Sequence, residues 1–126
     1  MAHVVVIDDE APMRALVRQI LEVAGYQVSE AAEGAAGITL LRTLPVALLI
    51  TDLFMPGQEG IQTIVEVRRH FPQVKVLVIS GGAKRINIDL LPEARTFGAH
   101  GTLAKPFTRQ ELLDAVSAVL AQREED

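Results

Sequence analysis

Five short apolar runs, each followed by a segment with helical character, constrain the fold of this chain more than any other feature. The runs cover residues Val4–Ile7, Gln27–Ser29, Val46–Thr51, Val74–Ile79 and Thr102–Ala104. The first, third and fourth are almost continuous Val, Ile and Leu, which is typical of strands buried on both faces of a parallel sheet. The other two are shorter and more polar, as edge strands are. The alternation predicts an α/β fold, a doubly wound five-stranded parallel sheet with five helices on its two faces.

Start and stop signals mark the first predicted helix. Pro12 suits its first turn, and Gly25 follows its end. Three apolar residues recur at spacings of four and three and predict the buried face of this helix: Leu16, Ile20 and Val23.

Three further helices are predicted in segments 33–44 and 59–71 and at the end of the chain. In segment 59–71 the residues expected on the buried side are Ile61, Ile64, Val65 and Val67. The last helix opens with Thr108 and Glu111, which have the spacing of a capping box. A fifth, short helix is expected between Asp89 and Gly98.

Length and composition favour one globular domain over residues 1–126, with 122–126 as a polar tail or the start of a linker. Cysteine is absent, which excludes disulfides and thiolate–metal sites. The apolar runs are far shorter than the roughly 20 residues of a membrane-spanning helix. Met1 lies close to the first strand, so we expect a native N-terminus without a secretory signal, a cytoplasmic location and no membrane contact. With a net charge of -4 and no dense Lys/Arg stripe, direct binding of nucleic acid is not expected.

Polar side chains stand where the predicted strands end. In doubly wound sheets, ligands bind at the carboxyl ends of the strands. The residues at these ends are Asp8, Asp9, Asp52, Ser80 and Lys105. Three converging carboxylates raise one another's pKa unless a cation compensates, and Mg2+ suits an oxygen-rich site that also binds phosphate.

Together these groups predict a site for phosphoryl transfer. The Asp52 carboxylate can act as a nucleophile and form an acyl phosphate. The metal and Lys105 would neutralise charge on the phosphoryl oxygens, and the Ser80 hydroxyl would orient one of them. Taken singly, the acids read as helix caps or turn residues, and Lys105 as part of a solvated loop. Their coincidence at one edge of the predicted sheet favours a functional site.

In the order and spacing of its motifs the chain resembles a response-regulator receiver domain of two-component signal transduction. The resemblance spans almost the whole chain, from His3 to the last helix. The motifs that carry it are Asp8-Asp9 after Val-Val-Val-Ile, Thr51-Asp52-Leu53-Phe54-Met55-Pro56-Gly57, Ser80-Gly81-Gly82 and Lys105-Pro106-Phe107-Thr108.

The resemblance implies a role for each matching residue. Asp52 corresponds to the phosphoacceptor, with Lys105 and Ser80 as its catalytic neighbours. Asp8, Asp9, Asp52 and the backbone carbonyl of Phe54 would bind Mg2+. A cis Lys105–Pro106 bond and the strand order 2-1-3-4-5 are also implied.

The resemblance further implies a histidine kinase or phosphotransfer protein as the phosphoryl donor, and slow self-dephosphorylation. The downstream target, or a fused output domain, would read the face of the fourth helix, fifth strand and last helix. Many receivers carry a Tyr or Phe on the fifth strand that turns inward on activation. The matching residue here is Thr102, which has no large ring to make that movement.

Two other functions fit part of the pattern. A phosphatase of the haloacid-dehalogenase type also uses a strand-end Asp nucleophile, but it needs a second acid two residues later, where this chain has Phe54. An interaction module that has lost phosphorylation is disfavoured by the complete set of acids, serine and lysine. We therefore expect a signalling domain whose only chemistry is its own phosphorylation and dephosphorylation.

Overall fold

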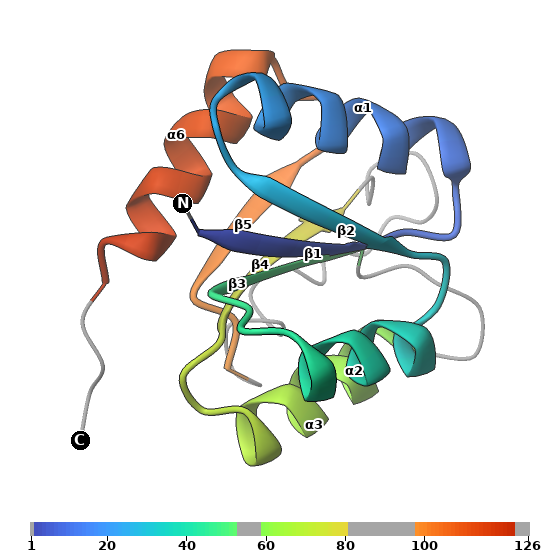
Figure 1. The fold of residues 1–126 in the computed structure, drawn as a ribbon. Helices are drawn as coiled ribbons and strands as arrows, with labels where there is room; N and C mark the ends of the chain where they lie inside the picture. The colour runs from blue at the N-terminus through green and yellow to red at the C-terminus, as the bar shows by residue number, and fades with distance from the viewer. Residues whose placement is uncertain (1, 53–58, 81–97, 123–126) are drawn as a thin grey trace.

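A five-stranded parallel sheet lies between two layers of helices in the computed structural model, which describes residues 2–52, 59–80 and 98–122 (Figure 1). The strands are β1 (His3–Ile7), β2 (Gln27–Ala31), β3 (Leu48–Asp52), β4 (Lys75–Ser80) and β5 (Gly101–Ala104). The helices are α1 (Ala11–Val23), α2 (Gly34–Thr43), α3 (Glu59–His70) and α6 (Arg109–Leu120). The additional helix expected between Asp89 and Gly98 lies almost wholly outside the described residues, so a count of five helices is not confirmed.

The strand order is β2-β1-β3-β4-β5, which confirms the predicted order. All four pairings are parallel, and their registers bring the carboxyl ends together. Ile7 pairs with Thr51, and Ser80 pairs with Ala104. The residues that follow β1 and β5 therefore emerge at the same edge as the last residues of β3 and β4.

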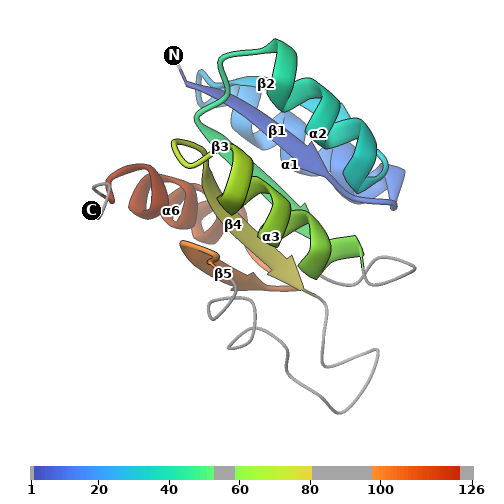
Figure 2. The same ribbon diagram turned by 90° about the horizontal axis from the view of Figure 1, so that it is seen from below.

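Two separate hydrophobic cores cover the two faces of the sheet, because alternate residues of a strand point to opposite sides. Val5, Leu49 and Val78 pack against α2 and α3 on one face. Val4 and Leu77 belong to the other core, under α1 and α6. Both views show this division of the helices between the faces (Figures 1 and 2).

Close packing fixes the end of β1 against α2. A Cβ atom added at Gly37 of α2 would collide with the side chain of Ile7, the last residue of β1. The helix can approach this strand so closely only because residue 37 has no side chain. The strand that leads into Asp8 is thus held from the α2 side.

The helix ends confirm most of the predicted signals. At the start of α6, the Thr108 hydroxyl accepts the Glu111 N–H at 3.0 Å, and the Glu111 carboxylate accepts the Thr108 N–H at 2.7 Å. Pro12 lies in the first turn of α1, and Gly25 follows the helix with a φ of 101°, a conformation that suits glycine. The Lys105–Pro106 bond is cis, as the resemblance implied.

The predicted buried face of α1 was wrong for two of its three residues. Val17 and Leu21 are the residues of α1 that become fully buried, whereas Leu16 is 45% exposed and Val23 is 69% exposed. The helix carries two adjacent apolar stripes, and periodicity alone does not tell which of them meets the sheet. Ile20, between the stripes, is only partly buried.

One residue of α3 was also misplaced. Ile64 and Val67 are fully buried and Ile61 packs at the rim of the core, as predicted. Val65 is 38% exposed, because the stripe that meets the sheet passes on the other side of Ile64.

Candidate functional site

Four of the predicted polar residues lie at one edge of the sheet. Asp8 follows β1, Asp52 ends β3, Ser80 ends β4 and Lys105 follows β5. Asp8, Asp52 and Ser80 are buried, at 4%, 2% and 2% exposure. Charged groups are rarely buried to this extent unless they are paired or bind a cation.

The ammonium group of Lys105 lies at the centre of this group. Its Nζ donates to Oδ2 of Asp52 at 2.9 Å and lies 3.5 Å from Oδ2 of Asp8. Oε1 of Glu10 lies 3.6 Å from the same nitrogen. The Lys105 side chain is only 13% exposed, so solvent screens these interactions little.

Backbone contacts hold the two sides of the site in place. The N–H of Asp8 donates to the carbonyl of Ala31 at 3.1 Å, and Oδ1 of Asp8 accepts the N–H of Glu10 at 2.8 Å. The N–H of Lys105 donates to the carbonyl of Ser80 at 2.7 Å. One carboxylate oxygen of Asp8 is therefore engaged by the backbone, and the other faces Lys105.

Burial and charge act against each other in this cluster. Burial raises the pKa of Asp8, and the nearby Asp52 charge adds to this effect, while the Glu10 N–H and Lys105 only partly counteract it. For Lys105, burial is the largest single influence and lowers the pKa. The hydrogen bond and charge of Asp52, with the charges of Asp8 and Glu10, outweigh it and raise the pKa. The cluster thus keeps its lysine charged and disfavours ionisation of Asp8.

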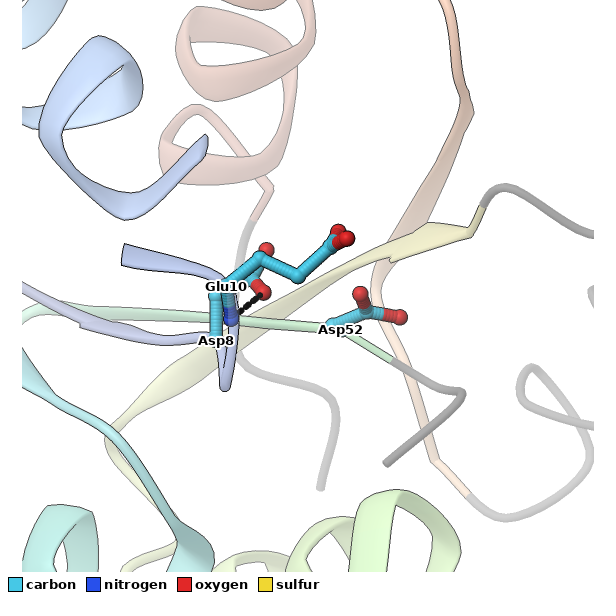
Figure 3. A group of neighbouring side chains, drawn as sticks. All are labelled: Asp8, Glu10 and Asp52. Atoms are coloured by element: carbon cyan, nitrogen blue, oxygen red, sulfur yellow. Dashed lines mark hydrogen bonds between the residues drawn. The ribbon is translucent and has the colours of Figure 1, made fainter. Parts of the chain in front are cut away.

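The donor set suits a hard divalent cation. Carboxylate oxygens of Asp8, Glu10 and Asp52 lie within 4.8 Å of one another, and Figure 3 shows the three side chains at this edge. Oxygen-only ligands from a few carboxylates are what Mg2+ uses, with water and phosphate completing its shell. The residues present therefore fit Mg2+.

Sequence reasoning missed Glu10 as a member of this group. It ends the acidic run Asp8-Asp9-Glu10 and directly precedes α1, so its place in that run was the available signal. Of the three acids in the run, Asp9 was predicted as a metal ligand, yet it is exposed and lies outside the group that converges on Lys105.

Other predicted features lie beyond this cluster. The backbone carbonyl of Phe54 and the Gly81-Gly82 pair fall outside the described residues. Thr102 lies within β5 and is partly buried. Its neighbour Gly101 leaves no room for a side chain, because a Cβ there would collide with Val119 of α6. In the described parts of the chain, no helix has the length and apolar character needed to cross a membrane.

Comparison with known proteins points to one family. The family model described as response regulator receiver domain matches residues 4–117. The protein CcdB of Bacillus subtilis (strain 168) is 33% identical over 121 residues, which cover 95% of this chain and 98% of CcdB. The chemotaxis protein CheY of Pseudomonas aeruginosa is 31% identical over 92% of this chain and 94% of its own length. A crystal structure of a response regulator from Thermotoga maritima superimposes with a TM-score of 0.85 at 29% identity, over 97% of this chain and 99% of that one.

Proposed function

This chain belongs to the response regulator receiver family, and from that premise we propose that it is a phosphoacceptor switch whose nucleophile is Asp52. Receiver domains are signalling domains of two-component phosphorelays, and they act with histidine kinases and with fused or downstream output domains. The observation that carries the proposal is the 2.9 Å contact between the Lys105 ammonium and Oδ2 of the buried Asp52.

The proposed reaction transfers a phosphoryl group from a phosphohistidine to Asp52. A carboxylate oxygen of Asp52 forms a bond to phosphorus as the N–P bond breaks, and the departing imidazole keeps the bonding electron pair and takes up a proton from water. The product is an acyl phosphate on Asp52. Lys105 is placed to pair with an oxygen of the transferred group, because its ammonium already contacts the accepting carboxylate.

The remaining site residues have supporting roles in this proposal. Ser80 would donate its hydroxyl hydrogen to another phosphoryl oxygen, since it ends the strand next to Asp52. Asp8, Asp9 and Asp52, with the Phe54 carbonyl, are the proposed holders of Mg2+, and Glu10, whose carboxylate lies in the same group as those of Asp8 and Asp52, adds negative charge beside them. Bound Mg2+ supplies positive charge that offsets the charge on the phosphoryl oxygens. Slow attack by water on the acyl phosphate would reset the switch.

A groove between α1 and α6, the α1–α6 groove, supports the choice of a protein as donor. This groove has a volume of about 470 Å3 and is lined by Leu16, Gln19, Ile20, Val23, Phe107 and Arg109. Its lining includes Phe107, which follows the site residue Lys105 by two residues in the chain, and this connection favours the groove as the seat of the donor. We assign the groove to an apolar helix of the histidine kinase or phosphotransfer protein.

A second surface is assigned to the output. The downstream target or fused output domain would read the face that includes β5 and α6, together with the helix expected between Asp89 and Gly98. Because Thr102 occupies the β5 position where many receivers carry Tyr or Phe, we propose that no aromatic ring turns at this position. We further propose a cytoplasmic location, no direct nucleic-acid binding and no membrane contact for this domain, which we take as a single unit over residues 1–126.

The proposal is tested with phosphoramidate, a small donor whose N–P bond mimics phosphohistidine. Wild-type protein incubated with phosphoramidate and Mg2+ should gain the mass of one phosphoryl group in intact mass spectrometry. Asp52→Asn should gain none, and chelation of Mg2+ should abolish the gain in wild type. Asp114→Asn serves as the matched control, because Asp114 is an exposed α6 residue that binds Gln110 and should leave the reaction unchanged.

The opposite outcomes would decide against the switch. An adduct that persists in Asp52→Asn would place the phosphoryl group elsewhere. Steady turnover of a phosphate ester by the purified chain would favour a phosphatase instead. Absence of both an adduct and Mg2+ binding would favour an interaction module.

A further inference from the structure

Arg14 of α1 joins the acidic site to the adjacent edge strand, β2. Its Nη1 donates to the backbone carbonyl of Asp8 at 2.6 Å. Its Nε donates to Oε1 of Glu30, on the edge strand β2, at 3.0 Å. The Arg14 guanidinium group therefore binds both the backbone of the site residue Asp8 and the carboxylate of Glu30 on the neighbouring strand.

Glu30 is held by two arginines of the same helix. Its second oxygen, Oε2, accepts Nη1 of Arg18 at 2.8 Å, and Nε of Arg18 also binds Glu22 at 3.0 Å. Arg18 is 42% exposed and Arg14 only 18%. Both arginines bind Glu30, and Arg14 also donates to the backbone of the site residue Asp8.

The bond from Arg14 to the Asp8 carbonyl lies where the chain leaves β1 for the site. The pairing of β1 with β2 ends at Ile7 and Ala31, and the Asp8 N–H still donates to Ala31. Beyond that bond the chain turns away toward α1. The bond from Arg14 restrains the peptide that joins Asp8 to Asp9, which leads to the Glu10 N–H that donates to the Asp8 carboxylate.

Partly exposed ion pairs contribute little to folding stability, so a stabilising role alone does not account for this arrangement. The arrangement resembles the outer contacts of metal sites, where groups behind the ligands set their orientation and affinity. A planar guanidinium suits this task, because it offers several donors in fixed directions.

We propose that Arg14, anchored by Glu30, is a positioning residue that holds Asp8 in the orientation required for cation binding beside Asp52. The inference rests on the proposed function, since it concerns the same Mg2+ site. The competing explanation is that Arg14 only fastens α1 to β2, as Arg18 does.

The test compares Arg14→Met with Arg18→Met. Each variant removes one arginine side chain of α1 that binds Glu30. Mg2+ affinity of the unphosphorylated protein is measured by isothermal titration calorimetry. Arg14→Met should weaken binding about tenfold, the lower range for outer-sphere substitutions at metal sites. Arg18→Met should change the affinity less than twofold. Equal effects of the two variants, or no effect of Arg14→Met, would overturn the inference.

A second measurement does not depend on the metal. Amide hydrogen exchange at Glu10 reports the bond from its N–H to Asp8, and it should accelerate about tenfold in Arg14→Met and stay unchanged in Arg18→Met. Unchanged exchange in both variants would contradict the positioning role. If Arg14→Met does not fold, Arg14→Lys replaces it, and its Mg2+ affinity should fall below that of Arg18→Met. Failure of the wild type itself to bind Mg2+ would instead overturn the proposed function, while the exchange measurement would still decide how Asp8 is held.

Discussion

At the scale of single residues, the carboxylate of Asp8 is buried beside a second carboxylate before any cation is bound. Burial is the main reason that its pKa is raised. Between the ordinary pKa of 3.8 and the raised value, the folded state binds more protons than the unfolded state. The free energy of unfolding therefore falls as the pH rises through this window, and the ionised carboxylate costs stability at neutral pH.

Replacement of Asp8 by Asn should stabilise the metal-free protein at pH 7. We expect a gain of about 1 kcal/mol or less, which raises the melting temperature by a few degrees in a domain of this size. The gain should shrink as the pH is lowered toward 4. Thermal unfolding in the presence of a chelator measures it, with the exposed Asp9→Asn as control, for which little change is expected. A loss of stability in Asp8→Asn at neutral pH would contradict this account.

Glu10 provides a second prediction at this scale. Its carboxylate is 52% exposed and 3.6 Å from the Lys105 nitrogen, so it adds negative charge to the site at moderate distance. Glu10→Gln should weaken Mg2+ binding about fivefold, or about 1 kcal/mol, as expected for a half-exposed charge. Calorimetric titration measures the change. Glu22→Gln, a similarly exposed acid further along α1, should leave the affinity unchanged, and equal losses in both variants would point to a general charge effect.

The positions of these residues were only partly predictable. Asp8, Asp52, Ser80 and Lys105 were predicted as site residues because each directly follows or ends an apolar run. The carboxyl ends of such runs lie at one edge of a parallel sheet. Glu10 was not predicted, since its inclusion depends on how the chain turns from β1 into α1. That turn is set by contacts such as the bond from Arg14 to the Asp8 carbonyl, which no local pattern encodes.

At the scale of elements, α1 serves two surfaces. Val17 and Leu21 bury it against the sheet, while Leu16 and Val23 remain exposed beside α6. Apolar spacing predicted a helix but selected the wrong stripe, because both stripes satisfy the helical period and only the tertiary packing chooses between them. The stripe that the prediction assigned to the core lines the groove assigned to the donor.

A charge placed in this groove should impair transfer from a protein donor alone. Leu16→Glu should lower the kcat/KM for transfer from a phosphorylated histidine kinase at least tenfold, because a carboxylate would have to be desolvated at an apolar contact. Phosphorylation by phosphoramidate should be unchanged. Val65→Glu is the matched control, since Val65 is a comparably exposed apolar residue of α3 in the other helix layer. If Leu16→Glu transferred normally, the donor would dock elsewhere.

At the scale of the whole molecule, the fold was the most predictable feature. Continuous aliphatic runs for β1, β3 and β4, more polar edge strands and capped helices all favour the same doubly wound sheet, and such agreement between levels specifies a fold. The observed strand order was implied by the resemblance to receivers, because strand order depends on long-range pairing that local sequence patterns do not reveal.

Because the site joins β1, β3 and β5, a bound cation should stabilise the whole domain. At a Mg2+ concentration 100 times the Kd, the expected stabilisation is about 2.7 kcal/mol, or a rise of roughly 10 °C in the melting temperature. Thermal unfolding monitored by circular dichroism should show this rise as one cooperative transition. The fluorescence of the single tyrosine, Tyr26, should give the same midpoint. Asp8→Asn should lose most of the shift. Equal shifts in wild type and Asp8→Asn would place the stabilising cation outside the site.

The central claim, that Asp52 carries the phosphoryl group, is tested most directly by chemical trapping. Borohydride reduces an acyl phosphate to the alcohol, so a phosphorylated aspartate becomes homoserine. After reaction with phosphoramidate and Mg2+, reduction and peptide mass spectrometry should find homoserine at position 52, and none when Mg2+ is chelated. Homoserine at Asp8 or Asp9 instead, or its absence from every position of a protein that binds Mg2+, would contradict the account.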